Sequence, residues 1–191
     1  MTMLDVRVEP KLMTADEYVN RSDDGRWVEL INGEIVEMPP SSPRNTVLAG
    51  WILYLLAGFI IPRKLGYLSM ADGGYRVSPT SVMQPDVGFI TRARAGGLSG
   101  KVFPVAPDLA IEVISPSERV GKINEKLHAY LDGGTPYVWL VYPESRSVEI
   151  YTAVGQYTTI EESDTIDGGD LLPEFTVTGK ELFSVLDVED N

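Results

Sequence analysis

Two acidic residues interrupt apolar segments of this chain, and each could serve as a ligand for a divalent cation. Glu112 lies inside Leu109–Ile114 (LAIEVI), and Asp86 stands at the head of the apolar run Val87–Ile90. A carboxylate in an apolar strand costs free energy unless it is paired, hydrogen-bonded or bound to a metal. Hard cations such as Mg²⁺ prefer oxygen ligands and commonly take one or two carboxylates together with substrate phosphate oxygens. The two acids therefore indicate a Mg²⁺ or Mn²⁺ site. Each acid also has an interpretation without a metal. Glu112 could be a strand residue that faces solvent, and Asp86 could cap the turn after Pro85.

A lysine and a third acid are further candidates. Lys126 belongs to the predicted helix Glu118–Leu131, which directly follows the strand that carries Glu112. A lysine beside a metal-bound phosphate could orient the attacking water or offset developing charge. Glu29 is flanked by apolar residues in the predicted strand Trp27–Ile31. Simple exposure to solvent would explain either residue.

Residue types exclude several other kinds of site. The chain has no cysteine, which rules out disulfides, thiolate metal sites and cysteine nucleophiles. His128 is the only histidine, so a histidine cluster is excluded. Neither a G-x-S-x-G nucleophile elbow nor a P-loop occurs. The basic residues of the predicted loop Thr91–Lys101 could contact a phosphate backbone, although a solvated loop is the simpler interpretation; they are Arg92, Arg94 and Lys101.

Length and charge limit the possible partners. The 191 residues, of which 43% are hydrophobic, suit one domain with a core of its own. We expect about ten residues at the start and about five at the end to be peripheral. The net charge of −12 argues against a generic polyanion binder, because phosphate contacts need Lys and Arg, but a local basic face could coexist with it. Met1–Lys11 has no signal-peptide pattern, so we expect a cytoplasmic protein.

The predicted elements that must position the candidates form an α/β or α+β fold. Leu109–Ile114, the helix Glu118–Leu131 and the strand Tyr137–Val141 could form one crossover unit in a mixed sheet flanked by helices. The other predicted elements are a helix starting at Ala15, a hairpin of Trp27–Ile31 and Glu34–Met38 around Asn32-Gly33, strands Gly66–Met70, Gly74–Val77 and Met83–Ile90, a β-meander of Val148–Thr152 and Gln156–Ile160, and a final helix Lys180–Leu186.

One apolar helix requires a membrane test. It is predicted near Asn45–Ile61 and ended by Pro62. Its uncharged part, Val47–Ile61, is shorter than the roughly 18 to 20 residues that span a bilayer. Its large side chains recur at helical spacing, which favours a core helix or a homodimer interface and no membrane.

Several motifs, taken together and in this order, resemble the Uma family of "putative restriction endonucleases" in the PD-(D/E)xK nuclease superfamily. The resemblance covers roughly residues 14 to 183. Its carriers are Arg26–Glu34 (RWVELINGE), Gln84–Val87 (QPDV), Pro107–Ser117 (PDLAIEVISPS), Lys126 with Tyr130 and Gly134, and Tyr137–Val141 (YVWLV).

The resemblance implies a restriction-endonuclease-like core with roles for the candidate residues. Asp86 and Glu112 would be the acids of the two halves of the motif, and the carbonyl of Val113 an extra metal ligand. The lysine that often stands two residues after the second acid is absent, and Lys126 would replace it from the helix. Glu29 would be an auxiliary acid near the metal.

The chain departs from the family pattern at two positions. Asn45 stands where a histidine is common, and Lys122 where an aspartate is common.

The leading hypothesis is Mg²⁺-dependent hydrolysis of DNA. A catalytically silent binding or assembly module is the alternative, motivated by the apolar helix and the net charge. A hydrolase of another phosphate ester is a third.

Overall fold

A six-stranded mixed sheet forms the centre of the molecule, in the strand order β10-β9-β8-β7-β6-β3. The computed structural model describes residues 12–22 and 24–187. The helices are α1 (Ala15–Asn20), α2 (Pro43–Arg63), α3 (Arg92–Ala95), α4 (Val120–Asp132), α5 (Gly179–Phe183) and the 3-10 helix η1 (Ser184–Asp187). The strands are β1 (Val28–Ile31), β2 (Glu34–Glu37), β3 (Gly66–Met70), β4 (Tyr75–Ser78), β5 (Ser81–Met83), β6 (Val87–Thr91), β7 (Leu109–Val113), β8 (Tyr137–Tyr142), β9 (Ser147–Ala153), β10 (Gln156–Ile160), β11 (Thr165–Asp167) and β12 (Thr176–Thr178).

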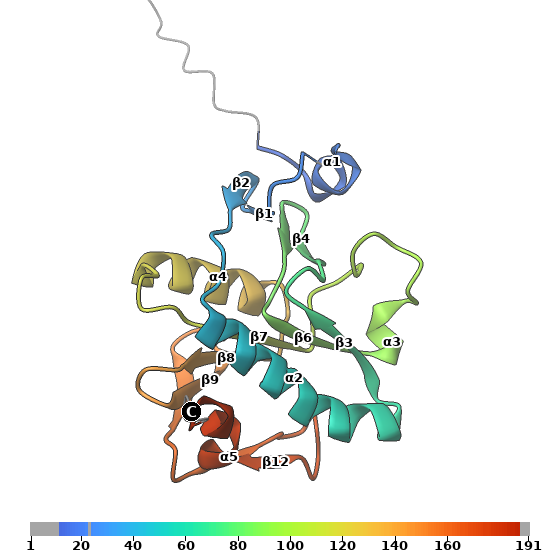
Figure 1. Ribbon diagram of the computed structural model, residues 1–191. Helices are drawn as coiled ribbons and strands as arrows, with labels where there is room; N and C mark the ends of the chain where they lie inside the picture. Colours follow the sequence, from blue (N-terminus) through green and yellow to red (C-terminus); the bar gives the residue numbers. More distant parts are fainter. Residues whose placement is uncertain (1–11, 23, 188–191) are drawn as a thin grey trace, which may run out of the picture.

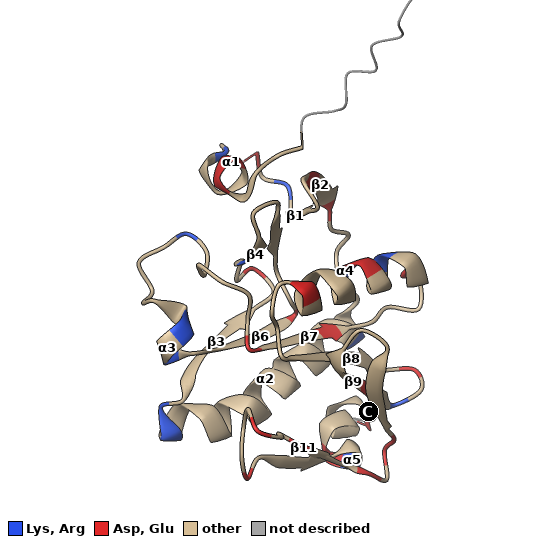
Figure 2. Cartoon of the chain, turned by 180° about the vertical axis from the view of Figure 1, so that it is seen from behind, with Lys and Arg blue, Asp and Glu red and all other residues tan. Residues whose placement is uncertain are grey.

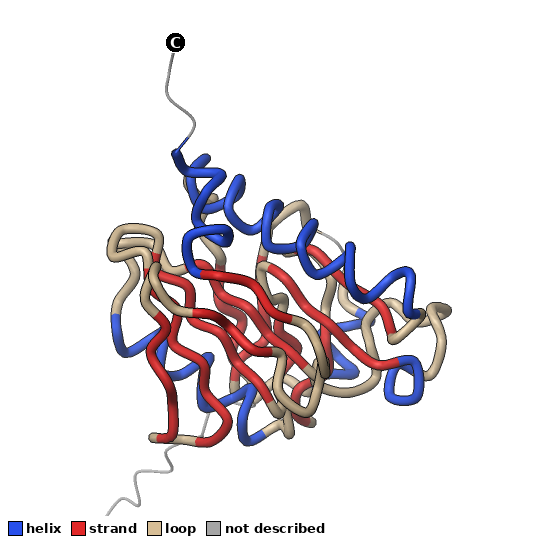
Figure 3. Tube along the Cα trace, turned by 90° about the horizontal axis from the view of Figure 1, so that it is seen from below, coloured by secondary structure: helices blue, strands red, loops and turns tan. Residues whose placement is uncertain are grey.

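The predicted mixed sheet with flanking helices is confirmed. Within the six-stranded sheet β7 and β8 are parallel and are joined by α4, whereas the other neighbouring strands pair antiparallel. Helix α2 lies on one face of the sheet and α4 on the other (Figures 1 and 3). The crossover unit expected from the sequence is therefore present, and it carries Glu112 in its first strand.

Strand β7 separates two cores by the alternation of its side chains. Leu109 and Ile111 belong to the core that includes α2, α5 and the β11–β12 hairpin. Ala110 and Ile114 belong to the second core, which includes residues of α4. Successive residues of a strand point to opposite faces, so Glu112 shares the α4 side with Ala110. The apolar pattern of β7 thus directs one carboxylate toward α4.

A smaller sheet of order β2-β1-β5-β4 adjoins the α4 side. Its hairpin β1–β2 is confirmed: Asn32 has φ +51° and Gly33 has φ +84°, as the type I′ turn requires. The capping box at Thr14 and Glu17 that starts α1 is also present. The hairpin places Glu29 in the middle of β1, where its side chain is fully buried.

Proline accounts for two differences from the sequence prediction. Pro62 does not stop α2 but lies inside its last turn, because only one backbone donor is lost there and the N–H of Lys64 bonds the carbonyls of Ile60 and Ile61. The predicted strand Met83–Ile90 is wrong as one element. Pro85 cannot donate to a ladder, and the chain leaves the small sheet after β5 and enters the large sheet at β6.

Short elements account for the other differences. The predicted loop Thr91–Lys101 begins with the one-turn helix α3, and the predicted helix Lys180–Leu186 is divided between α5 and η1. Helix α4 starts at Val120 rather than at Glu118, whose carboxylate accepts a hydrogen bond from the N–H of Ser115. Strands β11 and β12 were not predicted, since three residues are too few to show an alternating pattern.

Helix α2 has one buried and one exposed apolar face. Leu48, Ile52, Leu56 and Ile60 are buried against the sheet, as expected for a core helix. The helix is long and apolar enough to cross a membrane, but a core helix meets the same criteria, so this is weak evidence.

The burial of Ile52 in α2 predicts a cost that an exposed aliphatic residue does not have. Ile52 is 1% exposed, whereas Val154, which lies outside α2, is 51% exposed. Ile52→Ala should lower the free energy of unfolding by about 3 kcal/mol, since it opens a cavity in the core. Val154→Ala, the control, should change it by under about 1 kcal/mol. Urea denaturation of both variants measures the difference, and equal losses would contradict the burial of Ile52.

Candidate metal centre

Three carboxylates and one lysine meet between β1, β7 and α4. The Nζ atom of Lys126 is 2.8 Å from each carboxylate oxygen of Glu112 and 3.4 Å from Oε2 of Glu29. All three side chains are almost fully buried. Asp86 directly precedes β6 and lines the same cleft as Glu112 and Lys126. The structure therefore brings together all four side chains that the sequence singled out, while their catalytic roles stay predictions.

Helix α4 presents two groups to Glu112. Lys126 and Tyr130 are four residues apart and therefore lie on one face of the helix. The hydroxyl of Tyr130 donates to Oε1 of Glu112 at 2.9 Å, and Tyr130 is completely buried. Glu112 is thus held by a cation and a hydroxyl from successive turns of the same helix.

Backbone hydrogen bonds connect Asp86 and Asn45 to the end of β7. The N–H of Val113 donates to Oδ2 of Asp86 at 2.8 Å. The carbonyl of Val113 accepts a hydrogen bond of 3.0 Å from Nδ2 of Asn45, which lies in the first turn of α2. A carbonyl oxygen has two lone pairs, so this bond leaves one for another partner. Asn45, which departs from the family pattern, is therefore a buried residue that holds the Val113 carbonyl in place.

Glu29 has one oxygen engaged and one without a hydrogen bond. Its Oε1 accepts from the N–H of Gln84 at 2.6 Å. Its Oε2 is buried and has no hydrogen-bond partner among the described residues, with the Lys126 ammonium at 3.4 Å. A buried carboxylate oxygen left in this state costs free energy unless a further positive charge is near.

Burial controls the protonation of the cluster. It raises the pKa of Asp86, and the hydrogen bond from Val113 opposes this rise only in part. Burial also raises the pKa of Glu112 against the attraction of Lys126, and the charges of Asp86 and Glu29 add to the rise. Burial alone would lower the pKa of Lys126, but Glu112 and Glu29 outweigh it and raise that pKa, which keeps the ammonium charged.

The charges of the cluster do not balance. Three carboxylates, each −1, face one ammonium, +1, which leaves a formal charge of −2 when all are ionised. One divalent cation would neutralise this charge. The cluster therefore has the charge and the oxygen donors that suit Mg²⁺ or Mn²⁺.

The donors that could hold a metal are few. Within residues 12–22 and 24–187, no group of three or more His, Cys, Asp or Glu side chains is arranged to hold a metal ion. Asp86, Glu112 and Val113 all line the cleft, and the N–H of Val113 bonds Asp86, so two carboxylates and one carbonyl remain as candidate oxygen donors. Two carboxylates and a carbonyl fit Mg²⁺, which keeps several waters rather than taking an all-protein shell.

A cleft of about 820 Å³ opens the cluster to solvent. One side is formed by β2 and the segment that leads to α2, and the other by the start of α4. Figure 2 shows acidic residues on both β2 and α4. The charged lining residues are Glu34, Glu37, Asp86, Glu112, Glu118 and Glu125, with Arg119, Lys122 and Lys126. A substrate in this cleft would reach the carboxylates directly.

The basic residues near α3 contribute to the fold rather than to the cleft. Nη1 of Arg94 is 2.6 Å from Oδ1 of the buried Asp108, and Nζ of Lys101 donates to the carbonyl of Val19. The guanidinium of Arg92 lies over the ring of Tyr67. None of the three basic residues lines the cleft. His128 is exposed on α4, away from the cleft lining.

Two contributors to the site were not assigned a role from the sequence. Tyr130 belongs to a motif of the family resemblance, and its spacing of four residues from Lys126 on one helix face indicates a shared target. Gln84 holds Glu29 through its backbone, which no residue-type signal reveals. Its position before Pro85 and Asp86 shows only that it belongs to the connection between two sheets.

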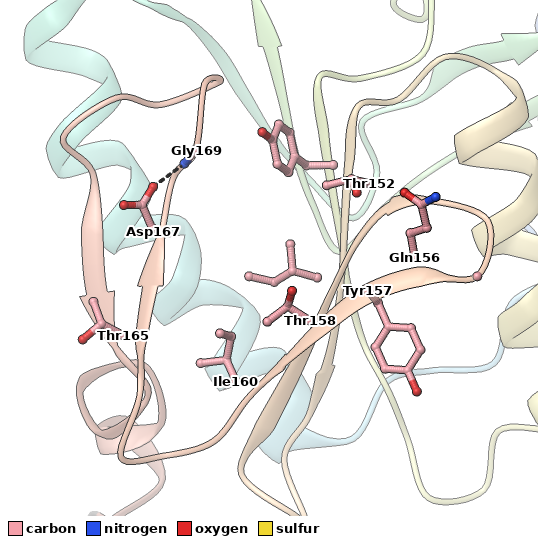
Figure 4. A pocket seen from close by; sticks show the side chains of 11 residues that line it. Thr152, Gln156, Tyr157, Thr158, Ile160, Thr165, Asp167 and Gly169 are labelled. Atoms are coloured by element: carbon pink, nitrogen blue, oxygen red, sulfur yellow. Dashed lines mark hydrogen bonds between the residues drawn. The ribbon is translucent and has the colours of Figure 1, made fainter.

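A second cavity, of about 520 Å³, lies between the β9–β10 hairpin and the segment around β11 (Figure 4). Its lining includes Thr152, Thr158 and Thr165 and a single carboxylate, Asp167, whose Oδ1 accepts from the N–H of Gly169 at 2.6 Å. Neutral hydroxyls and one satisfied acid offer no metal site or general base. Among the described residues, six acidic side chains line the cleft at α4, whereas one lines this second cavity.

Comparison with known proteins agrees with this fold. A crystal structure described as a "putative nuclease belonging to DUF820", from Anabaena variabilis ATCC 29413, superposes with a TM-score of 0.78 at 22% sequence identity. The match covers 91% of this chain and 99% of that chain. A search of curated proteins found no match. The family model Uma2, described as "Putative restriction endonuclease", matches residues 15–187 and therefore spans the cleft and every residue of the cluster. This chain belongs to the Uma2 family.

Proposed function

We propose that this protein is a metal-dependent endonuclease that hydrolyses phosphodiester bonds of DNA. The observation that carries the proposal is the cluster in which Lys126 pairs with Glu112 and Glu29 while Asp86 lines the same open cleft as Glu112 and Lys126. Membership of a family described as "Putative restriction endonuclease" supports the same reaction.

The metal-holding residues would be Asp86, Glu112 and the carbonyl of Val113. When bound there, Mg²⁺ or Mn²⁺ supplies a Lewis acid for the phosphate and lowers the pKa of a coordinated water. Tyr130 keeps Glu112 oriented through its hydrogen bond, and the N–H of Val113 keeps Asp86 oriented. Both acids are thereby fixed before a substrate arrives, which limits the cost of ordering them.

Lys126 would stabilise the charge that develops on the phosphate or position the attacking water. Its ammonium is held between Glu112 and Glu29 and contacts a proposed metal ligand, so it lies beside the reacting group. Glu29, fixed by Gln84, serves as the auxiliary acid that holds the ammonium in place. Hydrolysis forms a bond from the water oxygen to phosphorus and breaks the bond to the leaving oxygen, which takes up a proton.

The family departures are compatible with this reaction. Asn45 replaces the common histidine with an amide that still donates to the Val113 carbonyl. Lys122 is exposed at the cleft, where it adds a positive charge on the side from which a polyanion would approach. Neither residue removes a donor from the proposed metal ligands.

Metal binding is the first test. Wild-type protein should bind one Mn²⁺ with a dissociation constant in or below the millimolar range, and Asp86→Asn should weaken binding at least about tenfold, because it removes one anionic ligand. Isothermal titration calorimetry measures both. Asp164→Asn, an exposed acid outside the cleft, is the matched control. An intact fold without measurable Mn²⁺ affinity would favour the silent binding module instead.

Cleavage is the second test. In Mn²⁺ or Mg²⁺ the wild-type protein should nick or cut DNA, and Glu112→Gln should reduce the rate by at least about 100-fold, since a ligand and the anchor of Lys126 are changed together. Glu161→Gln, a matched change on the exposed surface, should leave the rate unchanged. Equal cutting by Glu112→Gln would show that another site or a contaminating nuclease is responsible.

We also propose that two copies of the chain associate through α2. Val47, Tyr54 and Ile61 recur every seven residues on its solvent face, and each is at least 50% exposed. Such a stripe suits the self-complementary interface of a twofold dimer.

We propose a cytoplasmic protein without membrane attachment, since the other face of α2 packs on the core.

The dimer predicts a specific change in mass. Sedimentation of the wild-type protein should give twice the mass of one chain, and Tyr54→Asp should give the mass of one chain, because it places a charge at the centre of the apolar stripe. Thr46→Asp, an exposed position beside the stripe, serves as the control for added charge. A wild-type protein that sediments as a single chain at micromolar concentration would exclude this interface.

A further inference from the structure

Trp27 is an exposed aromatic residue on the wall of the cleft. Its side chain is 44% exposed, and its Nε1 donates to Oε1 of Gln84 at 2.9 Å. A large exposed ring with a fixed orientation is unusual for a residue with no ligand, because most tryptophan surface is buried in folded proteins. The other strongly exposed aromatic residues of the described chain, Tyr54 and Tyr157, do not line the cleft.

Gln84 connects this ring to the proposed catalytic cluster. Its backbone N–H holds Glu29, its side chain holds Trp27, and Asp86 follows two residues later. Trp27 directly precedes β1, and its carbonyl accepts a hydrogen bond of 2.9 Å from the N–H of Met38, which fixes its backbone beside the strand that carries Glu29. The ring therefore occupies a fixed place next to the carboxylates rather than a variable place on the surface.

The charge of the cleft disfavours binding through many phosphates. Its lining carries six carboxylates and three basic side chains, a formal charge of −3. One divalent cation would reduce this to −1. Duplex DNA is bound largely by Lys and Arg that neutralise several phosphates, and Lys126 is already engaged with Glu112. Arg94 and Lys101 are engaged in the fold.

Stacking on an aromatic ring does not depend on basic residues. Every base has a π face, and an unpaired base can leave its strand to stack on a protein side chain. In a duplex the faces of the bases are covered by their neighbours. A cleft with a fixed ring and few free cations therefore suits an unpaired strand better than a duplex.

We propose that the cleft takes an unpaired DNA strand, in which a base next to the reacting phosphate stacks on Trp27. This proposal rests on the proposed endonuclease function and names its substrate class. Arg119 and Lys122, at the start of α4, contact phosphates on the opposite side of the cleft. The base-stacking contact supplies the affinity that the acidic lining does not.

Binding to one sequence in two forms tests the proposal. The full chain is titrated, with Ca²⁺ in place of Mg²⁺, into a fluorescent single-stranded oligonucleotide and into the duplex of the same sequence, and anisotropy is measured. The single strand should bind at least about tenfold more tightly. A duplex that binds as tightly as the single strand overturns the proposal without any variant.

Variants at Trp27 separate stacking from general packing. Trp27→Ala and Trp27→Leu should each weaken single-strand binding about tenfold, because neither has a π face, and Trp27→Phe should retain binding within about threefold. The matched control is Trp51→Ala, which removes another tryptophan whose Nε1 is hydrogen-bonded but which lies outside the cleft. It should not weaken binding. Thermal unfolding of each variant verifies the fold, and Trp27→Leu keeps the test valid if the alanine variant does not fold.

The outcomes also separate this proposal from the endonuclease function. If Glu112→Gln abolishes cleavage but Trp27→Ala behaves like Trp51→Ala, the endonuclease function stands and the stacking contact is wrong. If the wild-type protein neither binds nor cuts any DNA in the presence of metal, both are wrong.

Discussion

The structure depends on one electrostatic constraint: three carboxylates lie around a single buried ammonium. Lys126 is 2.8 Å from Glu112 and 3.4 Å from Glu29, with Asp86 beside them. Charges in a poorly solvated place are costly unless they are paired, and the burial of these acids raises the pKa of both Asp86 and Glu112. Such a cluster is poor for stability, because apolar residues could fill the same volume more favourably. We infer that it is kept for a cation that completes its charge.

The two faces of β7 pack against different parts of the fold, and this packing positions Glu112. One face contributes Leu109 and Ile111 to a core closed by α2. The other directs Glu112 toward α4, where Lys126 and Tyr130 meet it from successive turns. Because β7 and β8 are parallel, the chain must cross between them, and this crossover is the helix that supplies the lysine. The topology therefore places a helix beside Glu112, and Lys126 on that helix contacts Glu112 although the position two residues after Glu112 holds an isoleucine.

Much of this arrangement could be predicted from the sequence. An acid within an apolar strand made Glu112 a candidate, and the family resemblance selected Lys126 on the helix that directly follows that strand. The burial of Glu29 could not be predicted, because a hairpin acid flanked by apolar residues reads equally well as solvent-facing. The separation of β5 from β6 at Pro85 depends on which sheet each strand joins, a long-range choice that local pattern does not encode. For the same reason the sequence does not predict the two hydrogen bonds by which Gln84 holds Trp27 and Glu29.

We propose that a divalent cation completes the cluster, and diffraction from a crystal of the protein soaked with Mn²⁺ would locate that cation. Anomalous diffraction should reveal one manganese peak within coordination distance of Asp86, Glu112 and the carbonyl of Val113, with Lys126 still beside Glu112. No peak at that place under saturating Mn²⁺, with the three carboxylates and the lysine unchanged, would contradict the claim.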